Sequence, residues 1–535
     1  MHIGKSWEDE YPFIKPASSF LGGHDYDYII VGGGTVGCPL AATLSQNFRV
    51  LLLERGDVPF DNVNISYFDN MVYNLMDTSP KSASQAFVST DGVPNYRAKV
   101  LGGGTCINAG FYSRASTRFI EEAGWDVELA HNSYAWIERQ IVHQPKLKRF
   151  QRTFLNGLLE SGVLPFNGVT NDHLYGTKIT GTIFDERNYR YTAANLLTSG
   201  KPGNLEVLIH ATVQKLLFTK IGNRLHVTGV EFEDENWNQH QVFLSKGTKS
   251  EIILSSGTIG STQILLLSGI GPSDELLKLN ISMVLENGFV GKSLSDCSTN
   301  YALVQSEGNV DITPPQVVGI PKEGVYIEAF GGLTFPGKVI RFGEKHNSTQ
   351  RTRQTRLDVK NGLNEISFKK ELMGGYVLTK VIKPISRGQM NLISNSVYDQ
   401  PLVTFNYYSS QKDLTVCVSG LQLIRKIIKS NSFKNITNIN HKELGGTTLV
   451  DDEDSLKKLC KETVRTIYHY HGGCNVGRVV NNEYKVYGVD RLRVIDGSIF
   501  NESPGTNPQA TLMMIGRYMG IKILTNRLGN NADGI

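Results

Sequence analysis

Residues 26–56, YDYIIVGGGTVGCPLAATLSQNFRVLLLERG, decide the fold class of this chain. The apolar, β-branched run at 28–31 predicts a buried strand. A G-x-G-x-x-G turn follows it, then a helical stretch at 38–45 and a second strand at 49–53 that ends on an acidic residue. The acid stands about twenty residues beyond the turn, which is the spacing of a dinucleotide-binding βαβ unit.

Each position of this unit has a physical reason. The first glycine permits the tight turn, the second lets a pyrophosphate approach the backbone, and the third lets the helix lie close to the strand. The helix N-terminus offers unpaired N–H groups to phosphate, and the acid can accept hydrogen bonds from a ribose. An ordinary βα turn is the alternative, and the segment alone does not separate FAD from NAD. The cofactor-binding candidates are Gly32, Gly34, Thr35, Gly37, Glu54 and Arg55.

Length and composition indicate a globular protein of two domains. The chain has 535 residues, of which 40% are hydrophobic and 20% charged, and its net charge is +4. No basic patch with interleaved aromatic residues indicates nucleic-acid binding, and no apolar run is long enough to span a membrane. None of the cysteines forms a C-x-x-C pair, so no metal site is predicted. We expect a monomer that acts on a small molecule.

Periodicity predicts further elements along the chain. Residues 1–24 form a loose arm, and 57–96 form a long extension with short helices. The polar, basic stretch 338–365 is interpreted as an exposed loop, with a lid as the alternative. We expect strands at 207–210, 214–218, 227–232 and 251–254, and helices at 147–164, 411–430, 452–466 and 508–527.

A second glycine cluster lies at 97–110, RAKVLGGGTCINAG. Three consecutive glycines followed by small and amide side chains suit a close approach of the backbone to a flat ligand, and a flexible surface loop is the alternative. A further strand–glycine–helix unit runs over 251–267 and ends in SGIGP. The C-terminal part carries HYHGGC at 469–474, DGS at 496–498 and NPQ at 507–509.

Together these motifs resemble those of the glucose–methanol–choline (GMC) flavoprotein oxidoreductases over nearly the whole chain. Four blocks match in order, at 27–56, 100–110, 257–271 and the C-terminal motifs just quoted. The sequences HYHGGC, GVYIEA and DGSIFNESPGTNPQATLMMIGRYMG are most similar to the plant branch that holds (R)-mandelonitrile lyases and HOTHEAD-type proteins. The resemblance, and not the spacing of the glycines, implies FAD.

The resemblance also implies the architecture, which is α/β with mixed α+β features. We expect a Rossmann-like FAD-binding domain built from 25–125, 205–300 and 467–530. A substrate-binding domain on an antiparallel sheet would take 126–204 and 301–466.

Further cofactor residues follow from the family's motifs. The loop with Gly103, Thr105 and Asn108 would lie along the flavin, and Val213 would meet the adenine through its backbone. Some relatives link FAD covalently through a histidine just before the asparagine of this loop. Because Ile107 stands there, we predict non-covalent FAD. The flavin end would be closed by Asp496, Gly497, Pro508 and Gln509.

Oxidation of an alcohol by a flavin needs a base for the hydroxyl proton and a second group that holds the oxygen as charge develops. The family places the base first in H-x-x-G, which is His469 here, and the second group before a proline, which is Asn507. A structural imidazole in a turn is the alternative for His469. We interpret His471 as structural, because it would point the other way in an extended backbone. Tyr468 and Glu328 are predicted to line the substrate pocket.

The same scaffold supports a second reaction, in which a cyanohydrin loses its hydroxyl proton and releases cyanide with no net redox change. The lyases of this branch resemble the chain, but they have a second histidine in place of Asn507 and a pocket cysteine near 326–329, where this chain offers Glu328. Because a neutral amide supplies no cation to leaving cyanide, we favour alcohol oxidation over (R)-mandelonitrile lyase activity. A flavin-bound protein without turnover is disfavoured, because both catalytic positions hold competent residues.

The plant lyases carry one disulfide, and the contexts LTVCVSG around Cys417 and LCKETV around Cys460 match its two halves. The resemblance therefore predicts this bond, with two buried free thiols as the alternative. A disulfide favours a secreted, extracellular protein. The start MHIGKSWEDEYPF lacks the apolar region of a signal peptide, so this location requires a leader that was removed or missed. Glycosylation sequons, which occur at about chance frequency, stand at Asn64, Asn280, Asn347, Asn435 and Asn501.

Overall fold

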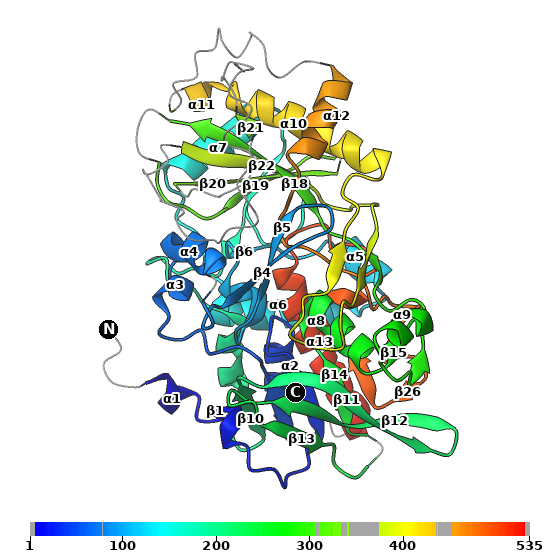
Figure 1. The fold of residues 1–535 in the computed structure, drawn as a ribbon. Coiled ribbons are helices and arrows are strands. Elements are labelled where there is room, and N and C mark those ends of the chain that lie inside the picture. Colours follow the sequence, from blue (N-terminus) through cyan, green and yellow to red (C-terminus); the bar gives the residue numbers. More distant parts are fainter. Residues whose placement is uncertain are drawn as a thin grey trace.

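The computed structural model describes residues 6–77, 79–247, 249–306, 310–322, 324–332, 340–341, 374–434, 436 and 452–529. The predicted loop or lid at 338–365, apart from 340–341, lies outside the described residues, as do the sequons Asn347 and Asn435. Two parts, each built on a large sheet, lie one above the other in Figure 1. Among the helices of the described ranges, none is long and apolar enough to cross a membrane.

The lower part is built on a parallel sheet of six short strands. Their order is β1–β10–β3–β2–β14–β27, and every neighbouring pair is parallel. Consecutive residues of β2 and β3 are all buried, so both faces of this sheet are covered. The strands are β1 (Ile14–Pro16), β2 (Tyr28–Val31), β3 (Val50–Leu53), β10 (Leu205–Ile209), β14 (Glu251–Leu254) and β27 (Leu492–Val494).

Helices and a small sheet complete this part. Helix α2 (Gly37–Leu44) packs against α13 (Gln509–Leu528), and α8 (Gly257–Leu267) follows β14. The predicted strands near 214–218 and 227–232 are longer than expected and form an antiparallel sheet with a third strand that was not predicted. That strand, QHQVF, buries only Val242, so it lacks an apolar period. The sheet comprises β11 (Thr212–Ile221), β12 (Arg224–Glu233) and β13 (Gln239–Phe243), with β26 (Val489–Asp490) beside β12.

The upper part is an eight-stranded sheet of order β21–β18–β22–β20–β19–β8–β7, with β25 beside β18. Its four central pairings, from β18 to β8, are antiparallel, as the sequence analysis predicted. The strands are β7 (Phe166–Val169), β8 (Gly176–Ile179), β18 (Ser298–Gln305), β19 (Val317–Ile320), β20 (Val325–Gly331), β21 (Ile340–Arg341), β22 (Gly374–Val381) and β25 (Arg465–Thr466).

One face of this sheet is covered by helices, which lie above it in Figure 1. A disulfide between Cys417 and Cys460 joins α10 to α12, which confirms the predicted bond. The alternation of β20 sends Val325, Ile327 and Ala329 into the core beneath these helices, and the intervening residues to the opposite face. The helices are α7 (Arg149–Glu160), α10 (Gln411–Ile428), α11 (Asn431–Lys434) and α12 (Glu453–Glu462).

Several sequence-based expectations differ from the structure. The stretch 1–24 is not a loose arm throughout, because Ile14–Pro16 pair as β1 with β10 and their neighbours Tyr11 and Phe13 are buried in the core. The helix expected at 452–466 ends at Glu462, because Arg465 and Thr466 pair as β25 with β18. The helix expected at 147–164 spans Arg149–Glu160. The extension at 57–96 contains a hairpin as well as short helices, because β4 (Ser84–Val88) pairs with β5 (Pro94–Ala98).

The packing also bears on the predicted division into domains. Helix α6 (Val127–Ile141) and the short 3-10 helix Ala193–Ser199, both expected in the substrate-binding domain, share the core of the parallel sheet. Tyr134 and Ile137 of α6 are fully buried there, and α6 contacts α13. These two stretches therefore pack with the dinucleotide unit.

The remaining elements are short. They are α1 (Trp7–Glu10), α3 (Val63–Ser66), α4 (Met71–Met76), α5 (Thr117–Glu122), α9 (Ser273–Lys278), β6 (Phe111–Tyr112), β9 (Gly181–Thr182), β15 (Ile270–Gly271), β16 (Leu285–Glu286), β17 (Lys292–Leu294), β23 (Gly388–Asn391) and β24 (Leu402–Thr404).

Candidate active site

A cavity of about 480 Å³ lies between the two sheets, and residues far apart in sequence line it. The glycine turn, the 97–110 loop and Val213 supply one part of its wall, and β18, β20 and β22 supply another. The segments 467–471, 496–497 and 507–509 complete it. The cavity therefore connects the dinucleotide unit to both predicted catalytic residues.

The three glycines of the first turn have different surroundings. Gly32 has a φ of +104°, and a Cβ there would lie 2.5 Å from the Ser255 carbonyl oxygen. A Cβ on Gly37 would overlap the Gly32 carbonyl oxygen. Gly34 borders the cavity, and a Cβ there would meet nothing nearer than Gly103 Cα at 3.7 Å. The first and third glycines therefore serve packing, while the second leaves room at the cavity wall.

The acid that follows β3 also borders the cavity. Glu54 is buried, borders the cavity and accepts hydrogen bonds from the N–H groups of Gly33 (2.9 Å) and Gly56 (2.8 Å). Burial raises the pKa of this carboxyl group. Arg55 also lines the cavity and donates from Nη2 to the Ala98 carbonyl oxygen at 3.1 Å.

The second glycine cluster folds into a short 3-10 helix, Gly103–Cys106, against the first. Thr105 does not line the cavity. It is fully buried, donates to the Gly102 carbonyl oxygen at 2.6 Å and accepts from the Ala193 N–H at 2.9 Å. Of the predicted cofactor residues, Thr105 and Gly37 are the two that the structure places behind the wall; the others border the cavity.

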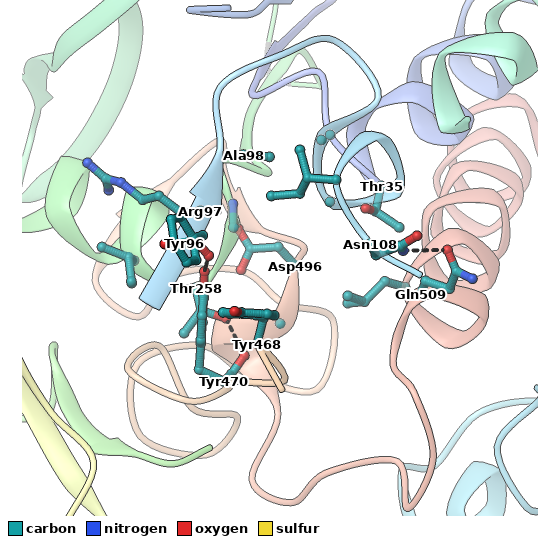
Figure 2. Close-up of a pocket in the computed structure, with 18 of the residues that line it drawn as sticks. Thr35, Tyr96, Arg97, Ala98, Asn108, Thr258, Tyr468, Tyr470, Asp496 and Gln509 are labelled. Carbon is teal, nitrogen blue, oxygen red and sulfur yellow. Dashed lines mark hydrogen bonds between the residues drawn. The ribbon is translucent and has the colours of Figure 1, made fainter. Parts of the chain in front are cut away.

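Two amide side chains join this loop to the C-terminal helix. Asn108 donates from Nδ2 to Gln509 Oε1 at 2.8 Å, and Figure 2 shows the two side chains facing each other. Gln509 in turn donates to the Phe111 carbonyl oxygen at 2.5 Å, and Arg190 donates to Asn108 Oδ1 at 3.1 Å. Pro508 caps α13 at this point. The loop and the helix are therefore fixed to each other at the cavity wall.

Asp496 joins two further segments at the cavity. Its carboxylate accepts from the N–H groups of Gly257 (3.0 Å) and Ser498 (2.8 Å) and from the hydroxyls of Ser261 and Ser498. Burial raises its pKa. The carboxylate holds the start of α8 against the turn that contains Gly497, and Figure 2 shows its side chain among those lining the cavity.

The wall also holds a buried guanidinium that the sequence analysis did not select. Arg97 is 8% exposed and donates from Nε to Gln85 Oε1 at 2.9 Å. Its Nη2 is buried without a hydrogen-bond partner among the described residues. Burial, and after it the charge of Arg55, lowers the pKa of Arg97 to about 9. Such a cation at the wall of this cavity fits a ligand that carries phosphate.

His469 is held by its backbone on a buried carboxylate. Its N–H donates to Asp296 Oδ1 at 3.0 Å, while Asp296 Oδ2 accepts from the hydroxyls of Tyr407 and Thr466, each at 2.6 Å. Tyr468, which precedes it, also lines the cavity and has a φ of +62°, an uncommon conformation that is characteristic of functional sites. Among the described residues, no side chain forms a hydrogen bond with the imidazole, so the backbone of the loop positions the ring.

The ring of His469 is suited to act as a base. Nδ1 is buried without a hydrogen-bond partner among the described residues. Burial lowers the pKa of the ring well below its usual range, and the charges of Lys380 and His471 lower it further. The imidazole is therefore neutral near pH 7.

His471 also lines the cavity, although it was interpreted as structural. Its backbone pairs with Ser295 in an antiparallel bridge, and its Nδ1 lies 3.2 Å from the His469 carbonyl oxygen. Nε2 is buried without a partner in the described part of the chain, and burial lowers the pKa of the ring to about 4. The turn at Gly472 and Gly473, both with positive φ, brings both imidazoles to the same cavity.

Asn507 has a charged neighbour that sequence reasoning missed. Lys380 of β22 donates from Nζ to Asn507 Oδ1 at 2.5 Å and forms an ion pair with Glu328 Oε1 at 3.3 Å. Asn507 and Glu328 border the cavity, as predicted residues of the pocket, while the Lys380 side chain is fully buried. The neutral amide of Asn507 therefore has a cation directly against it, and Glu328 balances the charge of that cation.

A dinucleotide-binding sheet joined to a sheet-walled pocket, with a neutral histidine where the two meet, defines a cofactor-dependent enzyme. The family models described as GMC oxidoreductase match residues 26–298 and 384–516, which together cover more than half of the chain. The chain belongs to the GMC oxidoreductase family, and this membership implies FAD as its cofactor.

Named relatives align over nearly the whole chain. "Protein HOTHEAD" of Arabidopsis thaliana is 52% identical, over 98% of this chain and 94% of that protein. The "(R)-mandelonitrile lyase-like" protein of Arabidopsis thaliana is 41% identical, over 96% and 93%. "Sinalpyl alcohol oxidase Nec3" of Nesocodon mauritianus is 40% identical, over 97% and 92%. The family thus includes relatives named for both reactions considered.

A solved structure agrees on the fold. The pyridoxine 4-oxidase from Mesorbium loti superposes with a TM-score of 0.74 at 19% sequence identity, covering 93% of this chain and 98% of that chain. At this identity the likeness concerns the fold alone.

Proposed function

We propose that the protein oxidises the CH–OH group of an alcohol, with His469 as the base and Asn507 as the group that holds the oxygen. The proposal rests on one observation: both residues border the same cavity, and the glycine turn borders it too. The proton-accepting ring and the oxygen-binding amide would therefore meet the same ligand beside the cofactor.

The residues of the cavity fit FAD. Gly34 leaves space at the wall, the Arg97 guanidinium offers an N–H donor that has no partner among the described residues, and Glu54 can accept from a ribose. Gly257 begins α8, and a Cβ there would meet nothing within 4 Å. When bound, FAD would supply the acceptor for the hydride. We propose that it is held without a covalent bond, because Ile107 offers no nucleophilic atom.

The roles of the chain's own residues follow from their surroundings. The neutral imidazole of His469 takes the hydroxyl proton as a hydride leaves the same carbon, so the alcohol becomes a carbonyl compound. The Asn507 amide stabilises the charge that develops on the oxygen. Tyr301, Phe330 and Leu378 give the pocket an apolar wall, which favours an alcohol with an apolar or aromatic body.

The decisive experiment adds alcohols to the purified yellow protein without oxygen. A panel of primary aryl and alkyl alcohols should bleach the oxidised flavin, and each bleaching event should yield an aldehyde. A His469→Ala variant should bind FAD and fail to bleach. If mandelonitrile instead yields benzaldehyde while the flavin stays oxidised, the protein is a lyase and the redox proposal is wrong.

We further propose that the protein is an extracellular monomer. The Cys417–Cys460 disulfide supports an oxidising compartment. Light scattering on the purified protein tests the monomer, and a fluorescent fusion to the full-length gene product tests the location.

A further inference from the structure

Lys380 is a fully buried lysine with three distinct neighbours. Its ammonium donates to Asn507 Oδ1 at 2.5 Å, pairs with Glu328 Oε1 at 3.3 Å and lies 4.0 Å from the centroid of the Tyr326 ring. The exposed fraction of its side chain is 0%, and that of Glu328 is 1%. An ammonium group has three N–H donors, and here each has a partner, because a π face also attracts a cation.

The sheet register determines this arrangement. Tyr326 of β20 stands directly opposite Lys380 of β22, and Glu328 stands opposite Leu378, so Glu328 and Lys380 are diagonal neighbours on one face. Both residues belong to the interior of an antiparallel sheet. Asn507, by contrast, lies in the segment that precedes α13. The ion pair is therefore a rigid support for a side chain from a different part of the fold.

The contact determines which way the Asn507 amide faces. The oxygen and nitrogen of an amide are hard to tell apart by position alone, so their assignment rests on the neighbouring groups. An ammonium has donors and no acceptor, so the amide atom against Lys380 must be the oxygen. The amide nitrogen is then the other terminal atom of the planar group. Among the described residues, no hydrogen bond from this nitrogen to the protein is present.

We propose that Lys380 is a positioning residue that acts through Asn507: it holds the amide oxygen so that the amide N–H donors face the substrate oxygen. This inference rests on the proposed function, because it deepens the role given to Asn507. Without Lys380 the amide could turn over and present its carbonyl oxygen, which would repel an oxygen that gains negative charge. The pocket would thereby bind a substrate oxygen that accepts a hydrogen bond, such as the alkoxide-like oxygen of the reacting alcohol or the carbonyl oxygen of the product.

Glu328 has a supporting role. A buried ammonium without a counterion is costly, and removal of one partner of a buried pair leaves the other uncompensated. Glu328 balances the charge of Lys380 and fixes its position from the neighbouring strand. A variant that replaces Lys380 alone could therefore fail to fold, and a useful test must remove both charges together.

A double-mutant cycle tests the coupling. The first arm is Asn507→Ala, the second is Lys380→Met with Glu328→Gln, and the third combines all three changes. The rate of anaerobic flavin bleaching by an alcohol should fall about 100-fold in the first arm and about 10- to 100-fold in the second. If Lys380 acts through Asn507, the combined variant should be no slower than Asn507→Ala, within about twofold.

Lys178→Met is the matched control for loss of a buried lysine. Lys178 of β8 is also fully buried, but it donates to Ser113 Oγ at 2.8 Å and to the Asp172 carbonyl oxygen, and among the described residues it makes no hydrogen bond to Asn507. The fold-change in bleaching rate caused by Lys178→Met should multiply with that caused by Asn507→Ala, as expected for independent residues. If the fold-change caused by the paired Lys380 and Glu328 substitutions also multiplies with that of Asn507→Ala, or if the pair leaves the rate unchanged, the positioning role is overturned.

A binding readout separates this inference from the proposed function. Benzaldehyde presents a carbonyl oxygen without requiring turnover, and its binding is followed by the change in the absorption of the oxidised flavin. We expect Asn507→Ala and the paired Lys380 and Glu328 changes to weaken benzaldehyde binding by similar factors, and the combination to weaken it no further. If no alcohol bleaches the wild-type flavin, the proposed function fails, whereas this binding cycle still decides for or against Lys380.

Discussion

The imidazole of His469 carries the proposed proton transfer, and its environment favours the neutral form. The ring is close to one ammonium and one other imidazole, while the nearby Asp296 carboxylate is engaged by the backbone N–H of His469 and by two hydroxyls. Burial raises the pKa of Asp296 to about 6. After burial, the charge of Lys380 is the largest influence on the pKa of the ring, and a positive neighbour disfavours a second positive charge.

The pH dependence of catalysis follows from this arrangement. Because burial, then Lys380, then His471 lower the pKa of His469, kcat/KM for an alcohol should stay constant as the pH falls through 6.5 and decline only at lower pH. Replacing Lys380 by Met together with Glu328 by Gln removes the repelling charge, so the acidic limb should move to higher pH. A pH profile of kcat/KM measures both, and Lys178→Met should leave the limb in place. An unchanged limb in the paired variant would contradict the assignment of His469 as the titrating base.

At the scale of elements, the glycines of the first turn meet two different requirements, close packing of the helix and space for the cofactor, which the motif alone does not distinguish. Gly37 is needed for the contact of α2 with the turn, whereas Gly34 faces the cavity and meets no atom closer than 3.7 Å. The same residue type therefore serves folding at one position and cofactor approach at the other.

Alanine at these two positions should give different failures. Gly34→Ala should fold with a Tm near that of the cofactor-free wild type, because its Cβ makes only ordinary contacts, but its affinity for FAD should fall at least tenfold. Gly37→Ala should lower the stability by about 2 kcal/mol or more, because its Cβ overlaps a backbone oxygen. Thermal unfolding of the cofactor-free proteins and titration with FAD measure the two effects. Equal loss of stability in both variants would refute the distinction.

The disulfide between α10 and α12 stabilises the helical layer over the second sheet. Cys417 and Cys460 are separated by 43 residues, and a crosslink across such a loop restricts the unfolded chain. Cys417→Ser with Cys460→Ser should therefore lower the free energy of unfolding by about 2–4 kcal/mol. Denaturant unfolding checks this value, and a reducing agent should lower the stability of the wild type without affecting the double variant. Activity per folded molecule should change little, because neither cysteine lines the cavity.

For the whole molecule, motifs whose residues are close in sequence could be predicted, and contacts between residues that are far apart in sequence could not. Gly32 and Glu54 lie within one βαβ unit, so their spacing alone indicates a dinucleotide. The resemblance to the family placed His469 and Asn507 at one site, and they do border one cavity. Lys380 was missed because its partners, Glu328 and Asn507, are 52 and 127 residues away: the pairing of β20 with β22 brings Glu328 beside it, and tertiary packing brings Asn507 there from the segment before α13. Residues 127–141 lie in the stretch that the resemblance assigned to the substrate-binding domain, whereas the apolar face of α6 packs beside the parallel sheet.

Binding of the cofactor should stabilise both parts of the molecule together. The cavity takes walls from the parallel-sheet part, as at Gly34 and Val213, and from the second sheet, as at Phe330 and Leu378. A ligand that binds only the folded state stabilises it by about 4 kcal/mol when its free concentration is about 1,000 times Kd. If FAD is held without a covalent bond, the Tm of the cofactor-free protein should therefore rise steadily with added FAD, and denaturation followed by filtration should release all the flavin. A covalent link would leave the flavin with the chain and make the Tm independent of added FAD, and this outcome would show that a group other than residue 107 attaches it.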